Sequence, residues 1–589
     1  MKTIPKKQQK YQRHIIYLGL LLGMFSPVLL AQPLVATTTQ QGIANADSEN
    51  SVNSDNYKLP PLPEDDDSLS SIAHIFVKEF VFKGNHVFSD ATLSQLTSAF
   101  ENRNISAEEL QAVKNNITRY YIDAGYINSG AIIPDQQVEQ GIIVLNIIEG
   151  RLVEVEVTGH ERLRTSYIQK RIRSADEEIL NIKTLQERLQ LLQQNPRLKR
   201  INAELGPGIE LGEGILKIDV EETRPYQLDF RFNNHRSPSV GAYRGEIIAQ
   251  HLNLSGLLGK QMGFGDSLYL RYGLTEGLND YTINYSVPLN RYPTLLTFNL
   301  ERSDAEVVEE PFKQINIESE ADTYAVALTH PFYRTSSREF NLGLKVERRS
   351  SQTFLLGSPF PFSPGVGTDG ESKIAVIRFS QDWLDRSRVQ VIAARSSLNF
   401  GIDAWNATIN EEGTPDSRFV TWLGQFQWVR RLEFFQHAML KDSQLLFRTD
   451  LQWANEALLP LEKFSIGGAT TVRGYRENQL TRDNGWIASL EWRLPLAQWR
   501  LPKLSKNADD GMLYLAPFID YGRSWNHDDT TTSKNSTIYS VGLGLRWQPA
   551  QKLYAEVYWG AALHDEDIPE ATDDDLQDDG IHFEVNLAF

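Results

Sequence analysis

The C-terminal part of the chain alternates between apolar and polar residues over segments of about ten residues. These segments are separated by turn residues. The alternation is clearest at 539–547 and 581–589, where apolar side chains occupy every second position. An even number of two-faced strands predicts a closed, 16-stranded antiparallel transmembrane β-barrel over 225–589, with apolar side chains toward lipid. The predicted strands begin near Tyr226, Gly245, Asp266, Asn279, Thr294, Thr323, Glu339, Lys373, Arg388, Arg418, His437, Trp486, Gly511, Thr537, Lys552 and Gly580.

The chain ends on an aromatic residue, Phe589, within the last predicted strand. This position resembles the C-terminal aromatic signal by which outer-membrane barrels are assembled. The alternative fold for such a pattern, a soluble β-sandwich or propeller, needs neither strands this long nor an aromatic terminus. The pattern therefore favours the membrane barrel.

Before the barrel, a strand–helix–helix–strand–strand order occurs twice, over 73–150 and 151–224, as two small α/β modules. In the first copy, Ser106 opens a helix with apolar residues at helical spacing, and Gly125 ends it. The second copy is predicted to contain a strand over 153–159, helices over 165–172 and 182–193, and strands over 201–205 and 214–220.

The N-terminus has the features of an export signal. A basic stretch precedes an apolar run from Ile15 to Leu30, which is shorter than the ~20 residues of a membrane-spanning helix. Residues 1–46 are therefore predicted to be a signal peptide, with cleavage between 31 and 46, although a permanent N-terminal anchor is the alternative. Residues 47–72 are acidic and proline-containing, which predicts an extended linker.

Composition excludes several classes of function. The net charge of -17 argues against nucleic-acid binding, because phosphate contacts need a basic surface. The absence of cysteine excludes disulfides, thiolate catalysis and zinc–thiolate sites. No HExxH, P-loop or G-x-S-x-G motif is present, and the G-x-G-x-x-G at 365–370 precedes a strand rather than a helix. We expect no enzyme activity, cofactor or metal, and read the acidic residues at 573–579 as a solvated loop rather than a cation bridge to lipopolysaccharide.

Short motifs in the two N-terminal repeats resemble a known family of modules. The first-strand ends, Phe82-Lys83-Gly84-Asn85 and Val157-Thr158-Gly159-His160, resemble polypeptide-transport-associated (POTRA) modules. The segment Tyr121–Tyr126 is similar to the exit of the second helix in such modules. A small mixed sheet with an exposed edge can accept another strand through main-chain hydrogen bonds; the alternative is that the modules are spacers.

Two further motifs narrow the resemblance. A predicted loop over 456–485 contains Val472, Arg473, Gly474 and Tyr475, which resemble the VRGY tip of the inward-folded loop of POTRA-plus-barrel transporters. The thirteenth predicted strand, the second after this loop, contains the partner F-x-D-x-G motif of the barrel wall. The resemblance implies that Arg473 reaches the motif's aspartate across the lumen, where a guanidinium can bind a carboxylate through two parallel hydrogen bonds. The residues of the wall motif are Phe518, Asp520 and Gly522.

Two modules and sixteen strands resemble the two-partner secretion transporters (TpsB, the hemolysin secretion/activation type). The resemblance implies an outer-membrane protein with periplasmic modules that exports an unfolded TpsA-type exoprotein. It also implies contact with outer-membrane lipid and lipopolysaccharide, with the barrel-assembly machinery during biogenesis, and a monomeric state. The alternative is an outer-membrane assembly or insertion factor of the same superfamily, which usually has more modules. Residues 47–72 lack the pattern of the N-terminal plug helix that many family members carry.

Overall fold

The computed structural model describes residues 74–173, 179–290, 294–433, 443–527, 536–564 and 574–589. The predicted signal peptide and linker lie outside the described residues. The chain divides into two units, which we describe separately. One contains the C-terminal strands, and the other contains both N-terminal modules together with Ser255–Gly265. Among the described residues, no helix combines the length and apolar character needed to cross a lipid bilayer.

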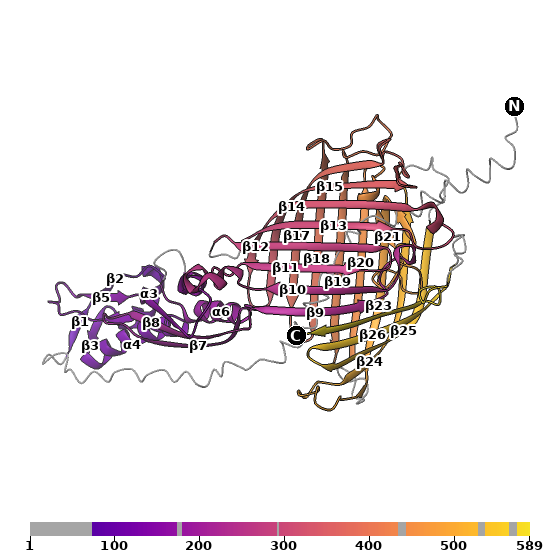
Figure 1. The fold of residues 1–589 in the computed structure, drawn as a ribbon. Helices are drawn as coiled ribbons and strands as arrows, with labels where there is room; N and C mark the ends of the chain where they lie inside the picture. Colours follow the sequence, from indigo (N-terminus) through magenta and orange to yellow (C-terminus); the bar gives the residue numbers. More distant parts are fainter. Residues whose placement is uncertain (1–73, 174–178, 291–293, 434–442, 528–535, 565–573) are drawn as a thin grey trace. The chain divides into compact units, whose positions relative to one another are not determined.

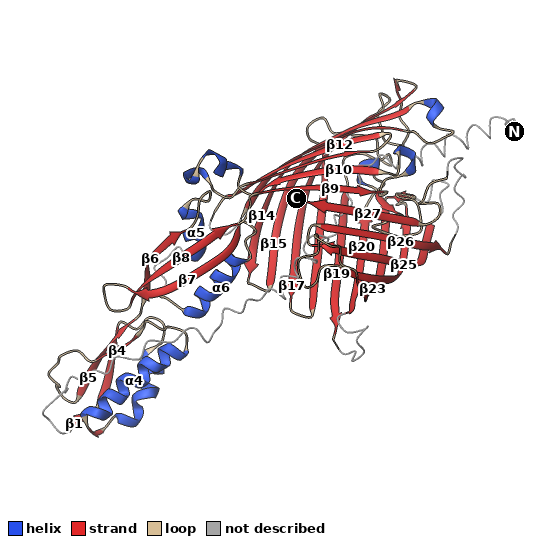
Figure 2. Cartoon of the chain, turned by 60° about the horizontal axis from the view of Figure 1, so that its bottom comes forward, coloured by secondary structure: helices blue, strands red, loops and turns tan. Residues whose placement is uncertain are grey.

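The C-terminal unit is a closed barrel of sixteen long antiparallel strands, in which each strand pairs with the next and the last pairs with the first (Figures 1 and 2). A two-residue strand, β16 (Ser358–Pro359), adds to the end of β15. The sixteen strands are β9 (Tyr226–Asn233), β10 (Arg244–His251), β11 (Ser267–Leu274), β12 (Leu278–Pro288), β13 (Leu295–Glu306), β14 (Ile317–Arg334), β15 (Arg338–Leu355), β17 (Glu371–Arg386), β18 (Gln390–Ile402), β19 (Val420–Leu432), β20 (Ser443–Ala454), β23 (Asn484–Gln498), β24 (Met512–Trp525), β25 (Ser536–Ala550), β26 (Leu553–Ala562) and β27 (Ile581–Ala588).

The predicted barrel is confirmed. Most predicted strand starts lie within two residues of the observed ones. The predicted start at His437 lies outside the described residues, and β20 is described from Ser443. The other large difference is in β14, which begins at Ile317 rather than Thr323. Polar residues at 318–322 concealed this extension, because the strand there carries acidic side chains on its outward face. The short one-turn helices lie in the connections: η4 (Pro238–Val240), η5 (Leu254–Leu258), η6 (Lys260–Met262), η7 (Lys313–Ile315) and η8 (Pro460–Glu462).

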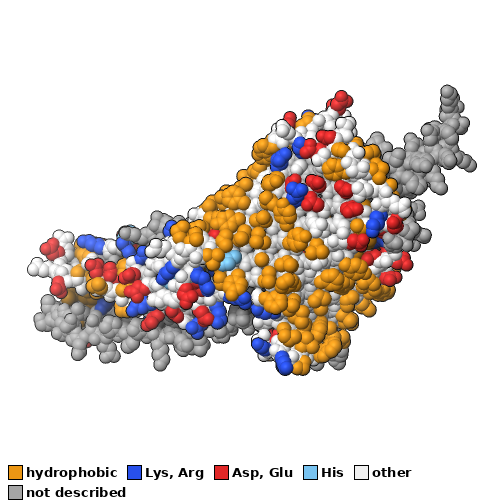
Figure 3. Space-filling view, viewed as in Figure 1, with side chains coloured by type: hydrophobic (Ala, Val, Ile, Leu, Met, Phe, Trp, Pro, Cys, Tyr) orange, Lys and Arg blue, Asp and Glu red, His pale blue; other side chains and the backbone are white. Residues whose placement is uncertain are grey.

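The barrel strands have one apolar and one polar face. In β25, Leu543 is 49% exposed on the outside, whereas Ser540 on the inside is fully buried. Figure 3 shows hydrophobic side chains over much of the visible barrel wall. Lipid offers no hydrogen bonds, so this pattern suits a sheet whose backbone groups pair with one another around a closed ring.

The first and last strands join through a short pairing. Only five residue pairs link β27 to β9, whereas fifteen link β15 to β17. Phe589 extends this seam, because its N–H donates to the carbonyl of Leu228 at 2.8 Å. Its ring also packs edge-on against Phe230, with the ring centroids 5.7 Å apart. The C-terminal aromatic residue therefore contributes directly to barrel closure.

The first module contains a mixed sheet in the order β2-β5-β4, with β2 parallel to β5. Ser106 and Glu109 form a reciprocal capping box at the start of α4, as the Ser106 helix start predicted. The structure adds β3, which pairs with β1 and was not predicted. The elements are β1 (Ile75–Val77), β2 (Glu79–Lys83), α3 (Asp90–Thr97), η3 (Ser98–Phe100), β3 (Arg103–Ile105), α4 (Ala107–Asp123), β4 (Gly130–Ile132) and β5 (Ile142–Ile148).

The second module repeats this plan with a sheet in the order β6-β8-β7, in which β6 is parallel to β8. Both helices occupy the predicted residues, and both pack their apolar faces against the sheet. The side chain of Asn181 caps α6, and its backbone carbonyl also accepts the first helical hydrogen bond. The elements are β6 (Arg151–Thr158), α5 (Thr165–Ile172), α6 (Ile182–Gln193), β7 (Leu198–Pro207) and β8 (Glu213–Glu222).

Candidate functional site

The loop between β20 and β23 forms a hairpin that contacts the inner faces of many barrel strands. Its short strands, β21 (Phe464–Ile466) and β22 (Leu480–Arg482), pair antiparallel. The loop ends at Asp483, two residues before the predicted end, because β23 begins at Asn484. All four residues of the VRGY motif lie in the turn between β21 and β22.

Arg473 binds the wall residue that the sequence motif predicts. Its Nε and Nη2 donate to the two carboxylate oxygens of Asp520 at 2.8 and 2.9 Å, and its backbone N–H donates to the same carboxylate at 3.0 Å. Asp520 is fully buried and Arg473 is 7% exposed. Two parallel hydrogen bonds fix the orientation as well as the distance of such a pair. The structure thus brings together two residues that are 47 positions apart in the sequence.

Two aromatic rings hold the guanidinium of Arg473 in place. It lies 3.7 Å from the ring centroid of Phe518 and 4.7 Å from that of Tyr558. The two rings are themselves in edge contact, with centroids 5.8 Å apart. A desolvated cation over an aromatic face is stabilised by about 2 kcal/mol. The phenylalanine of the F-x-D-x-G motif therefore contacts the arginine directly, which sequence reasoning had not specified.

The two glycines of the motifs permit close approach between the loop and the wall. Gly474 has a φ of +90°, and a Cβ there would lie 2.7 Å from the carbonyl oxygen of Gly560 in β26. A Cβ at Gly522 would lie 2.8 Å from the Val472 side chain and 2.5 Å from that of Ile466. Any larger residue at either position must displace the loop backbone or its apolar core.

The remaining motif residues, Val472 and Tyr475, also bind the loop to the wall. Val472 is fully buried in a small apolar cluster with Ile466, Leu480 and residues of the wall. The hydroxyl of Tyr475 donates to the backbone carbonyl of Tyr539 at 3.0 Å or to that of His564 at 2.8 Å. All seven predicted motif residues therefore meet at one place on the inner wall.

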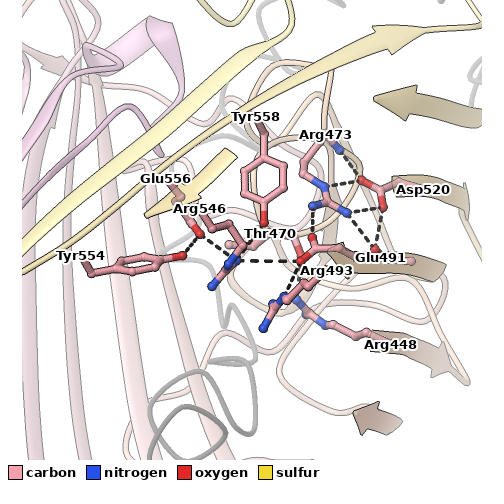
Figure 4. A network of polar contacts seen from close by, with 11 residues as sticks. Arg448, Thr470, Arg473, Glu491, Arg493, Asp520, Arg546, Tyr554, Glu556 and Tyr558 are labelled. Atoms are coloured by element: carbon pink, nitrogen blue, oxygen red, sulfur yellow. Dashed lines mark hydrogen bonds and ion pairs between the residues drawn. The ribbon is translucent and has the colours of Figure 1, made fainter. Parts of the chain in front are cut away.

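An acidic residue that the sequence did not single out completes the arginine's environment. Glu491, on the inner face of β23, accepts from Arg473 at 2.5 Å and from Arg493 at 2.7 Å. Arg546 lies 3.9 Å from the same carboxylate and 2.8 Å from Glu556. Figure 4 shows these residues as one continuous network. The alternation of β23 places Glu491 inward, so a charged residue at an inward strand position was the available signal.

The first part of the loop has a second anchor, which was also missed. Glu462, in η8, accepts from Arg349 at 2.8 Å and from Arg378 at 2.7 Å. These arginines lie on the inner faces of β15 and β17, and Arg378 is also 3.2 Å from Glu347. The loop is therefore tied to two separate parts of the barrel wall.

A third group of contacts joins the loop to neighbouring connections of the barrel. Arg476 donates to Glu309 at 2.6 Å and pairs with Asp578, which belongs to the acidic run at 573–579. That run was expected to be solvated, but at least this carboxylate is an ion-pair partner of the loop. Burial raises the pKa of the nearby Glu477 to about 7, although the backbone N–H of Ala469 opposes the shift.

The fold and this anchored loop define a class of protein: an outer-membrane barrel of the POTRA-plus-barrel superfamily. Residues 212–547 match the model of the haemolysin secretion/activation protein family ShlB/FhaC/HecB, and residues 75–150 match the ShlB-type POTRA domain. The chain belongs to the ShlB/FhaC/HecB family. It is therefore an outer-membrane transporter for protein secretion, with its POTRA modules in the periplasm.

Curated relatives match most of the chain at low identity. The outer membrane transporter CdiB of Dickeya dadantii is 21% identical over 81% of both chains. The hemolysin transporter protein ShlB of Serratia marcescens is 22% identical over 83% of this chain and 82% of its own. Among solved structures, CdiB from Escherichia coli superposes with a TM-score of 0.65 at 18% identity, covering 90% of this chain and 93% of the other. A structure of BamA from Haemophilus ducreyi that lacks POTRA domains 1-3 shares the fold with a TM-score of 0.51 at 12% identity, covering 88% of this chain and 100% of the other.

Proposed function

We propose that the two N-terminal modules receive an unfolded TpsA-type exoprotein and that the barrel conducts it to the cell surface past the anchored loop. The observation that carries this proposal is the buried Arg473–Asp520 pair. A hairpin held at this pair, and again at Glu462, contacts two parts of the inner wall at once. For an exported chain to pass, the hairpin must then detach from the wall at one of these two anchors.

The modules are suited to bind an extended polypeptide through their sheet edges. In the second module, β7 pairs with β8 alone among the described strands, so it has one edge without a described strand partner. In the first module, β2 and β4 are the edge strands. Main-chain hydrogen bonding at such edges recognises an extended conformation more than a particular sequence. This mode of binding suits a long cargo that must remain unfolded.

The curated relatives are named as an outer membrane transporter, a heme/hemopexin transporter protein and a hemolysin transporter protein. We propose that the cargo here is likewise a large secreted partner protein, and that the barrel provides a path rather than catalysis and needs no cofactor. We also propose that the chain acts as a monomer in contact with outer-membrane lipid and lipopolysaccharide. The barrel-assembly machinery would recognise its last strand, where Phe589 closes the seam.

The assembly-factor alternative rests on a likeness to BamA, which concerns the fold alone. The two functions make different predictions in cells. If the chain is a transporter, a neighbouring gene should encode a large secreted protein with an N-terminal secretion domain, and deletion of the transporter should retain that protein inside the cell. If the chain is an assembly factor, its deletion should cause a general loss of outer-membrane barrels.

The experiment is a secretion assay in which the chain is expressed with the exoprotein encoded beside it. We expect export to require both modules, and photo-crosslinkers on edge strand β7 to capture the exoprotein. Crosslinkers on the outer face of α4, for example at the exposed Asn115, serve as the matched control. Export without the modules, or equal capture at both positions, would contradict the proposed route.

A further inference from the structure

The lipid-facing wall of the barrel contains a pocket that the transport function does not use. Its volume is about 430 Å³, and it is lined by Leu451, Trp486, Arg523 and Trp525. These residues come from three adjacent strands, β20, β23 and β24. The register places Trp486 directly opposite both Leu451 and Arg523.

Strand alternation shows that the pocket faces outward. Asp520 and Gly522 point into the lumen, where they meet the anchored loop, so Arg523 points to the lipid side. Arg523 is exposed, and Trp486 is 42% exposed. The pocket is therefore separate from the loop site, although β23 and β24 contribute to both.

Chain direction places the pocket at the outer end of the barrel. The chain enters β9 from the periplasmic modules, and each strand reverses direction, so odd-numbered strands of the sixteen run outward. β20 and β24 are the eleventh and thirteenth strands, and Leu451 and Arg523 lie within four residues of their ends. Trp453 and Trp422, opposite one another on β20 and β19, continue the aromatic side chains at this level. Such aromatic residues mark the membrane–water interface.

The geometry of the pocket suits a phosphate attached to an apolar body. The Nε1–H of Trp486 donates to the hydroxyl of Thr449 at 2.9 Å, and its ring centroid lies 5.2 Å from that of Tyr521. These contacts hold the Trp486 ring, and Arg523 lines the same pocket. A guanidinium at the interface binds phosphate through paired N–H groups, while tryptophan and leucine offer contacts to sugar or acyl groups.

Arg523 differs from a comparable outward-facing arginine in its ion pairs. Arg302, on the outward face near the outer end of β13, has Asp304 at 3.4 Å and Glu320 at 3.6 Å. Among the residues that the structure describes, no carboxylate forms an ion pair with Arg523. A lipid-facing arginine is destabilising unless it lies near the interface and finds an anion there.

We propose that this pocket binds a lipopolysaccharide molecule of the outer leaflet, with Arg523 on a lipid A phosphate and Trp486 and Leu451 against its sugar or acyl chains. The outer leaflet supplies this phosphate at the level of the pocket. The site is distinct from a divalent-cation bridge to acidic loops, because it needs no metal.

The test is native mass spectrometry of the full chain in detergent with EDTA, titrated with purified lipid A. The wild-type protein should retain lipid A, and Arg523→Gln should weaken retention about tenfold, the loss expected for one charge-assisted contact. Arg302→Gln is the matched control and should retain lipid A as the wild type does. Heat-modifiable migration on gels verifies that every variant is a folded barrel.

Two probes identify the ligand class. The wild type should bind dephosphorylated lipid A no more tightly than the Arg523→Gln variant does. Inorganic phosphate should not displace lipid A from the wild type. Equal retention of lipid A by wild type and Arg523→Gln would overturn the proposal. Equal retention of phosphatidylglycerol and lipid A by the wild type would overturn the assignment to lipopolysaccharide.

Discussion

Replacing Arg473 by alanine is the sharpest test of the loop anchor. The change removes the cation that compensates Asp520, which is fully buried. Among the residues that the structure describes, Asp520 then keeps as donors only the hydroxyl of Ser489, at 2.6 Å, and the backbone N–H at 473. Glu491 is affected less, because Arg493 remains 2.7 Å away. The loss of loop-anchoring free energy should therefore arise almost entirely at Asp520.

Breaking a buried ion pair by removing one partner costs about 3–5 kcal/mol. Since 1.4 kcal/mol corresponds to a factor of ten, the population with a released loop tip should rise by roughly 10²- to 10³-fold or slightly more. The lost contacts of the guanidinium with Phe518 and Tyr558 act in the same direction. The barrel itself should persist, because the strand pairing does not involve the loop.

Hydrogen exchange of the full chain in detergent measures this effect. Amides at 467–479 should exchange much faster in Arg473→Ala than in the wild type, whereas amides of β24 should not. Arg493→Ala is the matched control, because Arg493 also pairs with Glu491 but belongs to the wall rather than the loop. Secretion of the partner exoprotein should fall in Arg473→Ala only. Unchanged exchange together with normal secretion would refute the anchoring role.

Four further predictions concern separate parts of the molecule. Gly474→Ala should also loosen the loop and reduce secretion, because its Cβ would lie 2.7 Å from a wall carbonyl, whereas a normal exchange pattern would contradict this. Glu462→Ala should cost about 1.5–3 kcal/mol of loop anchoring, less than Arg473→Ala, by the same exchange measurement. The pKa of Glu477 is raised, so the stability that it contributes is present below about pH 4.5 and lost as pH rises through about 7. The protection of loop amides, corrected for the intrinsic pH dependence of exchange, should therefore fall over that range, and Glu477→Gln should abolish this fall. Deleting Phe589 should slow barrel assembly, seen as reduced heat-modifiable protein, and unchanged assembly would argue against its role at the seam.

The sequence predicted the barrel well because lipid imposes a strict rule on each strand. Every second residue must be apolar over the membrane thickness, and this period survives in a single sequence. Beyond the membrane the rule no longer applies, which is why the acidic start of β14, from Ile317, was read as a loop. The three-residue strand β3 was missed for a different reason, since its pairing with β1 depends on the folded module.

The motif residues and the Arg473–Asp520 pair were predictable only through resemblance, and the further partners, Glu462 and Glu491, were not. No local pattern relates Arg473 to Asp520, because the pair forms only when the loop folds back into the closed barrel. Glu462 and Glu491 lie outside the motifs, and their roles depend on arginines from other strands. A useful signal was nevertheless present: a charged residue at an inward strand position needs a partner, and the folded loop supplies one.

The two anchors differ in what they leave behind when the loop moves. If Glu462 withdraws, Arg378 keeps Glu347 at 3.2 Å and Arg349 keeps it at 3.6 Å, so neither arginine is left without an anion. If Arg473 withdraws, Asp520 has no other described cation as an ion-pair partner. The electrostatic cost of release is therefore smaller at Glu462 than at the VRGY tip. This asymmetry favours a loop that moves away from the wall at its first segment while its tip stays bound at Asp520. The attachment at Glu462 is therefore the one that we expect an arriving chain to displace first.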